Sequence, residues 1–289
     1  RLTDVTGVQT CALPISLYVI HRPTYQSMYP PAQGLSLAAG QRLGHPAIGV
    51  WLGIAAMAAA FAWMLRGWLP GSWAWIGALL AIAQFVLLGR EYGGGVLGYW
   101  SQSYWGGAVA AAGGALVYGA LPRLQRGGGA APGLLFGLGL AVLANSRPYE
   151  GLVTAIPAGL VVAVHALRHR LSTRAVGAIA AAILAAAAGM GFYNHRVTGD
   201  AFKMPYMAHH EQYCTFFPLF GAHAPSAPVW NHEILRRHHE ASADHVRERY
   251  GTLPDAALHS LLKLRRLWFF FLGPLLTVQI GRASCRERV

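Results

Sequence analysis

The stretch AVGAIAAAILAAAAGMGFY, residues 175–193, contains no charged side chain. A helix rises about 1.5 Å per residue, so about 20 apolar residues cross a hydrocarbon core of about 30 Å. A helix of a soluble domain normally keeps a polar face, which this stretch lacks. The stretch therefore predicts a membrane-spanning helix, in which the dense Ala and Gly residues favour close packing against other helices.

Similar apolar stretches recur along the chain. Hydrophobic residues make up 54% of the sequence and charged residues only 12%, whereas soluble domains carry about 25% charged residues. The further stretches lie at residues 46–65, 72–89, 104–121, 131–146 and 151–167, and another begins near 267. We therefore expect an all-α fold, a polytopic transmembrane helix bundle with about six complete spans and a truncated seventh. The span at 131–146 is short, so either it stops inside a cavity or its ends lie further out.

The two ends of the chain are related through their codons. ALPI at 12–15 can be encoded by GCTCTTCCGATC, and the reverse complement, read from its second base, encodes IGRA at 280–283. Residues 1–15 and 280–289 resemble translated adapters of a short-read sequencing chemistry, and we expect them to be scars. Residues 16–279 are then expected to be an internal fragment of a longer protein. Of the three cysteines only Cys214 lies outside these ends, so no intrachain disulfide is expected.

Charge in the short loops predicts the orientation of the spans. Leaving out both ends removes four arginines and two acidic residues and lowers the net charge from +12 to +10. The loops after the first, third and fifth spans carry Arg66, Arg123, Arg126, Arg168, Arg170 and Arg174. Lysine and arginine concentrate on the cytoplasmic side, so these loops are expected to face the cytoplasm. The basic charge lies beside lipid headgroups, and membrane lipid rather than nucleic acid is the expected partner.

Lys263, Arg265 and Arg266 fall on the predicted outer side and run against this assignment. Long loops follow the charge rule weakly, and these side chains fit a position at headgroup level. The division that results is a scar at 1–15, an extracytoplasmic loop and surface helix at 16–45 and a membrane domain at 46–193. The membrane domain is followed by an extracytoplasmic segment at 194–266, the start of a truncated span at 267–279 and a scar at 280–289.

The stretch NSRPYEG at 145–151 places two ionisable residues at the edge of a predicted span. Ionised groups at membrane depth are costly and usually mark a site. Pro148 is expected to end the preceding helix. Arg147 is a candidate for binding a phosphate, and Glu150 for orienting it or a sugar hydroxyl, with Tyr149 between them. The alternative is an Arg–Glu pair that only closes a tight loop.

The stretch REYGGGVLGYWSQSYWGG at 90–107 combines charge, glycine and aromatic side chains. Arg90 and Glu91 form a second charged pair, and four aromatic residues follow at Tyr99, Trp100, Tyr104 and Trp105. The aromatic rings are candidates for stacking on a sugar, although an interfacial aromatic belt is the commoner role for such residues. The triple glycine does not form a dinucleotide-binding loop, because no strand precedes it.

Histidines concentrate after residue 200. His209, His210 and Glu211 are weak candidates for metal ligands, because adjacent side chains on a regular element diverge. In the polar stretch at 229–250, His239-Glu240 is followed by Ala243 where the zinc-protease motif requires histidine. The favoured interpretation is that these histidines line a solvated helix that lies on the membrane, with no metal bound. No cofactor can be named from the sequence.

Several short motifs support a family resemblance. Tyr29-Pro30-Pro31 leads to Gly44-His45 and then into a predicted span, SRPYE stands at 146–150, and WFFFLGP stands at 268–274. This pattern resembles the GT-C glycosyltransferases, membrane enzymes that include protein O-mannosyltransferases and lipid A aminoarabinose transferases. The chain as a whole is similar to a group of bacterial polytopic membrane proteins near that superfamily.

The resemblance implies transfer of a sugar from a polyprenyl-phosphate carrier at the outer face of the bacterial cytoplasmic membrane. In that family the catalytic base is an acidic residue upstream of the Tyr-Pro-Pro stretch, and this sequence has no acidic residue between Ser16 and Glu91. The fragment is therefore expected to lack this catalytic base and to contribute residues that bind the sugar donor. Arg147 would bind the carrier phosphate, with Glu150 and the tyrosines and tryptophans of the second loop around the sugar. Further candidates for donor binding are Tyr149, Arg90, Glu91 and Tyr29. The competing interpretations are a transporter or lipid-binding protein that makes no bond, and a structural membrane subunit.

Overall fold

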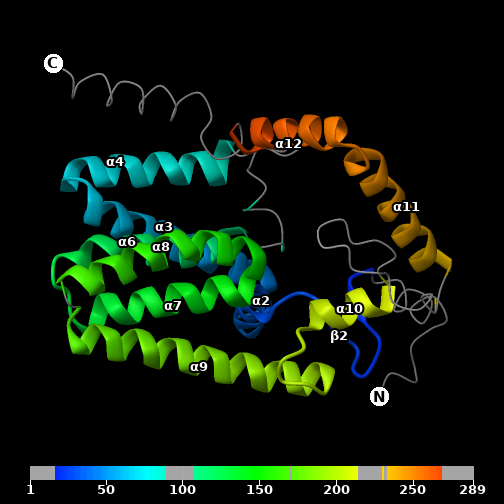
Figure 1. Ribbon diagram of the computed structural model, residues 1–289, viewed down its shortest axis with the longest axis horizontal. Coiled ribbons are helices and arrows are strands. Elements are labelled where there is room, and N and C mark those ends of the chain that lie inside the picture. The colour runs from blue at the N-terminus through cyan, green and yellow to red at the C-terminus, as the bar shows by residue number, and fades with distance from the viewer. Residues whose placement is uncertain are drawn as a thin grey trace. The chain divides into compact units, whose positions relative to one another are not determined.

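The computed structural model describes residues 17–88, 100, 104, 107–169, 171–213, 230 and 233–268. Within those residues the fold is all-α, with ten α-helices and one pair of two-residue strands (Figure 1). The chain divides into two compact units, which we describe separately. The bundle unit is the described part of Pro31–Met190 and Arg266–Val289, and the hairpin unit is the described part of Arg1–Pro30 and Gly191–Arg265.

The bundle unit holds the predicted spans. Its elements are α2 (Pro31–Arg42), α3 (Pro46–Trp68), α4 (Gly71–Ile82), the π-helical segment η3 (Ala83–Leu88), α6 (Gly107–Gln125), α7 (Ala130–Ser146), α8 (Pro148–His169) and most of α9 (Thr173–Thr198). Four of these helices, α3, α6, α8 and α9, are long and apolar enough to cross a membrane. The chain is therefore an all-α protein with four candidate membrane-spanning helices among its described residues.

Two of the six predicted spans are shorter than this length. Residues 72–89 form α4 and then turn into the π-helical segment η3, and α7 has 17 residues. The structure thus supports four spans directly, and the first and last of these helices run beyond the predicted ends. The seventh stretch, apart from Leu267 and Trp268, lies outside the described residues.

Helix ends follow local rules. Pro46 stands at the start of α3, where its missing N–H costs nothing, and the Ala47 amide donates a hydrogen bond of 3.1 Å to His45 Nδ1. Helix α9 continues past the apolar stretch at 175–193 to Thr198. It stops at Gly199, whose φ of +84° is the left-handed conformation typical of a helix stop.

The core of the bundle unit surrounds α6. Figure 1 shows α6, α7 and α8 running side by side, and α6 packs against α3, α7 and α8. Buried side chains from three helices meet here: Val117, Leu121, Leu124, Phe136, Leu143 and Ala158. The α6–α7 crossing is close because it is built on glycine. A Cβ atom at Gly139 would lie 2.7 Å from the Gly113 carbonyl oxygen, which is the close approach that small residues allow in membrane bundles.

Arg123 of α6 and Arg126, which follows that helix, contact the last turns of α3. Arg123 Nη2 donates to the Trp63 carbonyl at 2.8 Å, and its guanidinium carbon lies 4.0 Å above the Trp63 ring centroid. Arg126 Nη2 donates to the Gly67 carbonyl at 2.9 Å. The last carbonyls of a helix lack partners within the helix and carry its negative dipole end. Arg126, which the sequence marks only as loop charge, therefore also caps α3 at Gly67, and Arg123 contacts the helix one turn earlier at Trp63.

Within the described residues, the outer faces of α8 and α9 are apolar and exposed. Exposed side chains on α8 include Leu152, Val153, Ile156 and Leu160, and on α9 they include Ile183 and Leu184. A soluble helix would place polar side chains on such a face. We therefore expect the exposed apolar side chains of α8 and α9 to contact lipid.

The hairpin unit is built from segments far apart in the sequence. Strands β1 (Val19–Ile20) and β2 (Gln26–Ser27) pair antiparallel, and α10 (Pro205–Tyr213), α11 (Glu233–Tyr250) and most of α12 (Leu253–Leu267) follow. Ile20 is fully buried against Val197 and Ala208. Gln212 ties α10 to the hairpin, because its Nε2 donates to the Arg22 carbonyl at 2.6 Å.

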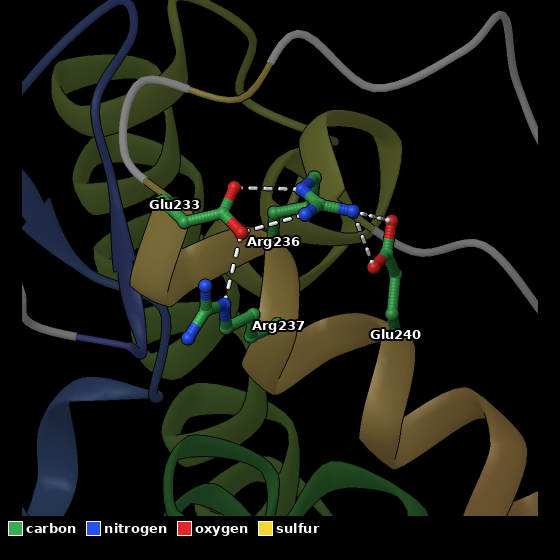
Figure 2. A network of polar contacts seen from close by, with 4 residues as sticks. All are labelled: Glu233, Arg236, Arg237 and Glu240. Atoms are coloured by element: carbon green, nitrogen blue, oxygen red, sulfur yellow. Dashed lines mark hydrogen bonds and ion pairs between the residues drawn. The ribbon is translucent and has the colours of Figure 1, made fainter.

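Helix α11 is stabilised along its first turns by the ion-pair network of Figure 2. Arg236 binds Glu233 through two hydrogen bonds of 2.6 and 2.8 Å and reaches Glu240 at 2.9 Å. Arg237 donates to the same Glu233 carboxylate at 2.9 Å. The hydrogen bonds from Arg236 and then Arg237 lower the pKa of Glu233 to about 2. The network therefore stays ionised throughout the physiological range, as expected of a solvated helix face.

Candidate functional site

The corner between α7 and α8 is a one-residue break. Helix α7 ends at Ser146, and Arg147 adopts φ −142° and ψ 81° as its C-cap, with its amide donating to the Leu143 carbonyl. Pro148 then begins α8, where its fixed φ suits the first turn. The Gly151 amide closes that turn by donating to the Arg147 carbonyl at 2.7 Å. The predicted end of the helix before Pro148 is confirmed, and it leaves the Arg147 side chain at a helix N-terminus.

Arg147 and Glu150 contact each other weakly. The Arg147 Nη1 to Glu150 Oε1 distance is 3.5 Å, and the two side chains are 51% and 65% exposed. Exposed ion pairs of this kind contribute about 0–1 kcal/mol. Glu150 is also the sole acidic side chain that the structure describes between residues 31 and 190. The guanidinium can therefore exchange this contact for a stronger anion at little cost.

The corner offers further hydrogen-bond donors. The Ser146 hydroxyl oxygen is buried and has no hydrogen-bond partner within the described part of the chain. The first N–H groups of a helix have no acceptor within the helix and form its positive dipole end. An exposed guanidinium and a helix N-terminus together match the chemistry of a phosphate or a carboxylate.

Only part of the predicted second-loop site falls on described residues. Arg90, Glu91, Tyr99 and Trp105 lie outside them. The Trp100 ring stacks on Phe85 at a centroid distance of 5.1 Å and packs over Gly107, so one face of it belongs to the protein core. Tyr104 is 49% exposed, and its carbonyl accepts a hydrogen bond of 3.2 Å from Gln33 Nε2.

Tyr149 and Tyr29 lie in different units. Tyr149, within the first turn of α8 in the bundle unit, is 53% exposed. Tyr29 belongs to the hairpin unit, where its ring lies 5.8 Å from that of Tyr18. The roles predicted for both residues at a sugar stay predictions.

The hairpin unit contains a cluster of histidine and aromatic rings that the sequence does not reveal. His239 of α11 stacks on Tyr213 of α10 at 5.4 Å and on Trp230 at 5.5 Å, and His209 lies 5.4 Å from His239. We name this set, with His21, the histidine cluster. The prediction that these histidines line a solvated helix face is wrong for His209, which is 5% exposed. Three segments meet here through tertiary folding, so no local periodicity signals the cluster.

The cluster holds its imidazoles in the neutral form. Burial lowers the pKa of His209 to about 4, and burial followed by the nearby His238 lowers the pKa of His239 to about 4. His209 Nε2 lies 3.3 Å from the Leu17 carbonyl oxygen, which only accepts, so the tautomer protonated at Nε2 makes this bond. Burial also lowers the pKa of His21.

The weak metal candidates do not converge. His209 faces Tyr213 and His239, the His210 ring lies 4.4 Å from that of Tyr206, and Glu211 pairs with Lys203. Among the residues described, no group of three or more His, Cys, Asp or Glu side chains is arranged to hold a metal ion. The divergence expected of adjacent side chains is what the structure shows.

Comparison of the chain with protein-family models, with curated proteins and with solved structures finds no match. The chemistry of the α7–α8 corner is therefore the main indication of function.

Proposed function

We propose that the α7–α8 corner binds the phosphate of a lipid-linked sugar, and that the protein is a membrane glycosyltransferase acting on a polyprenyl-phosphate-linked donor. In this proposal the corner faces the outer side of a bacterial cytoplasmic membrane. The resemblance to the GT-C glycosyltransferases supplies the reaction class, and the corner supplies the binding chemistry.

The main support for the proposal is the exposure, weak ion pairing and position of the Arg147 side chain. Its guanidinium is half exposed, is held by Glu150 only at 3.5 Å, and stands at the N-terminus of an apolar helix. A phosphate gains charge-assisted hydrogen bonds from such a group. The apolar outer face of α8 offers a path for a hydrocarbon tail, so a lipid phosphate fits better than a soluble one.

The chemistry divides between binding and catalysis. Glu150 repels a bound phosphate and is better placed to accept a hydrogen bond from a sugar hydroxyl. Arg147 binds and orients the donor phosphate, which stabilises the charge that grows on the carrier as the glycosidic bond breaks. The resemblance assigns the catalytic base to a residue upstream of Tyr29, so the described residues are proposed to bind the donor.

Binding of polyprenyl monophosphate to the purified protein in lipid nanodiscs tests this assignment. Hydrogen bonds to charged groups contribute about 1.5–3 kcal/mol, so Arg147→Ala is expected to weaken binding about 10- to 100-fold. Arg147→Lys keeps the charge and is expected to retain part of the affinity. The matched control is Arg168→Ala at the far end of the same helix, which is expected to leave the affinity within about twofold.

The proposal fails if Arg147→Ala and Arg168→Ala bind polyprenyl monophosphate alike. The competing transporter function has its own outcome. Binding that depends on Arg147, together with movement of an intact lipid-linked sugar across vesicles and no release of free carrier phosphate, would support transport in place of transfer.

A further inference from the structure

Helix α12 presents two parallel stripes with opposite chemistry. Leu253, Ala257, Leu261 and Leu264 recur at spacings of four, four and three residues, which places them on one face. Asp255, His259, Lys263 and Arg266 follow the same spacing two residues later, which places them on another face. We name these the leucine stripe and the polar stripe.

The leucine stripe is uncovered. Leu253 is 88% exposed, Leu261 63% and Leu264 61%, and no residue of α12 is buried in the described part of the protein. The contacts that join α12 to the end of α11 use the polar stripe, because Lys263 lies 4.7 Å above the Tyr250 ring and His259 lies 6.1 Å from it. Packing within the hairpin unit therefore leaves the leucines without a covering partner.

The charge of α12 and its place in the chain indicate what covers this face. Lys263, Arg265 and Arg266 crowd the last turns against a single carboxylate, Asp255, and an apolar sequence, WFFFLGP, begins at 268. An exposed apolar face beside clustered basic side chains is typical of helices that lie in the membrane interface. Anionic lipid headgroups complement that charge.

We infer that α12 lies flat in the membrane interface, with its leucine stripe in the acyl region and with Lys263 and Arg265, which flank that stripe on its two sides, at the level of anionic lipid phosphates. This inference rests on the chain being an integral membrane protein and does not depend on Arg147. It differs from the solvated helix α11, whose ion-pair network needs water on its charged face (Figure 2).

Spin labels at two leucines of α12 test the inference on the whole chain in vesicles containing phosphatidylglycerol. The native cysteines, Cys11, Cys214 and Cys285, are first replaced by alanine. Leu264→Cys labels the leucine stripe, and Leu262→Cys, about 160° around the helix, is its matched control. The label at 264 is expected to collide mainly with dissolved oxygen, which concentrates in lipid, and the label at 262 mainly with a water-soluble nickel complex.

Charge is tested in the same system. Each basic residue near an anionic surface is worth about a fivefold change in the interfacial equilibrium. Lys263→Gln with Arg265→Gln is therefore expected to lower the equilibrium constant for immersion of the label at 264 about 25-fold in anionic vesicles and to have little effect in phosphatidylcholine vesicles. A label at Ser242 of α11 should stay accessible to nickel in every variant.

Two results would overturn the inference. Equal nickel accessibility at 264 and 262 would make α12 a solvated helix, and protection of 264 from both reagents would mean that protein covers the leucine stripe. Loss of phosphate-lipid binding at Arg147 would leave either α12 result unchanged, so the two proposals fail separately.

Discussion

At the residue scale, the histidine cluster makes the hairpin unit sensitive to acid. The folded-state pKa of His209 and of His239 is about 4, against 6.5 for an unperturbed imidazole. The unfolded chain therefore binds protons more readily than the folded chain between these values. Stability is complete above pH 6.5, falls as the pH drops towards 4, and levels off below that, and His209 alone is worth up to about 3 kcal/mol.

The prediction is a lower melting temperature of the hairpin unit at pH 4.5 than at pH 7. His239→Phe keeps the stack on Tyr213 and Trp230 but cannot be protonated, so it is expected to flatten this dependence. Near-ultraviolet circular dichroism during heating measures it. A wild-type melting curve that does not move between pH 7 and 4.5 would show that the imidazoles are not buried as described.

Helix α11 could be predicted from the sequence, but the burial of its His239 could not. The polar character of the stretch at 229–250 predicts helix α11 well, and the helix runs from Glu233 to Tyr250. The burial of His239 and His209 depends on Tyr213 and Trp230, which reach them only through the tertiary fold. Arg147 is different, because its place between an apolar helix and Pro148 is a local property that the sequence already indicates.

At the element scale, hydropathy predicts where apolar helices lie but not where they end. The apolar stretch at 175–193 lies inside α9, which continues through polar residues to Thr198 because Gly199 ends it. The hydropathy of residues 72–89 does not predict the change from α-helix in α4 to π-helix in η3. Backbone hydrogen bonding and glycine set the ends of a helix, whereas hydropathy reports only its lipid-compatible length.

The α6–α7 crossing gives a steric prediction at this scale. A Cβ at Gly139 would lie 2.7 Å from the Gly113 carbonyl oxygen and 2.9 Å from the Val117 amide nitrogen, and these backbone atoms cannot rotate away. Gly139→Ala is therefore expected to destabilise the bundle by about 1–3 kcal/mol. Unfolding in mixed detergent micelles measures the change.

Gly114→Ala is the matched control, because a Cβ there meets no atom within 4 Å. Alanine has a higher helix propensity than glycine, so this variant is expected to be neutral or slightly more stable. Equal destabilisation by both substitutions would contradict the close crossing of α6 and α7.

At the scale of the whole molecule, the class of the protein follows from composition and the rest from tertiary structure. Apolar stretches predict a helical membrane protein, and four helices of sufficient length are present. The contacts of Arg123 and Arg126 with the last turns of α3 could not be predicted, because they depend on the packing of segments far apart in the sequence. Six α-helices carry the apolar stretches, and leucines on α8 and α9 are exposed within the described part of the chain, as expected of helices in contact with lipid.

The proposed function requires that α8 crosses the membrane with the Arg147 corner on the outer side. Its 22 residues give a length of about 33 Å, enough for a hydrocarbon core of about 30 Å. Single cysteines at Tyr149→Cys and His169→Cys, with the native cysteines replaced by alanine, report on the two ends of this helix. A membrane-impermeant thiol reagent added to intact cells is expected to label position 149 at once and position 169 only after the membrane is opened. Labelling of both positions from outside, or of position 169 alone, would contradict this orientation of α8 across the membrane.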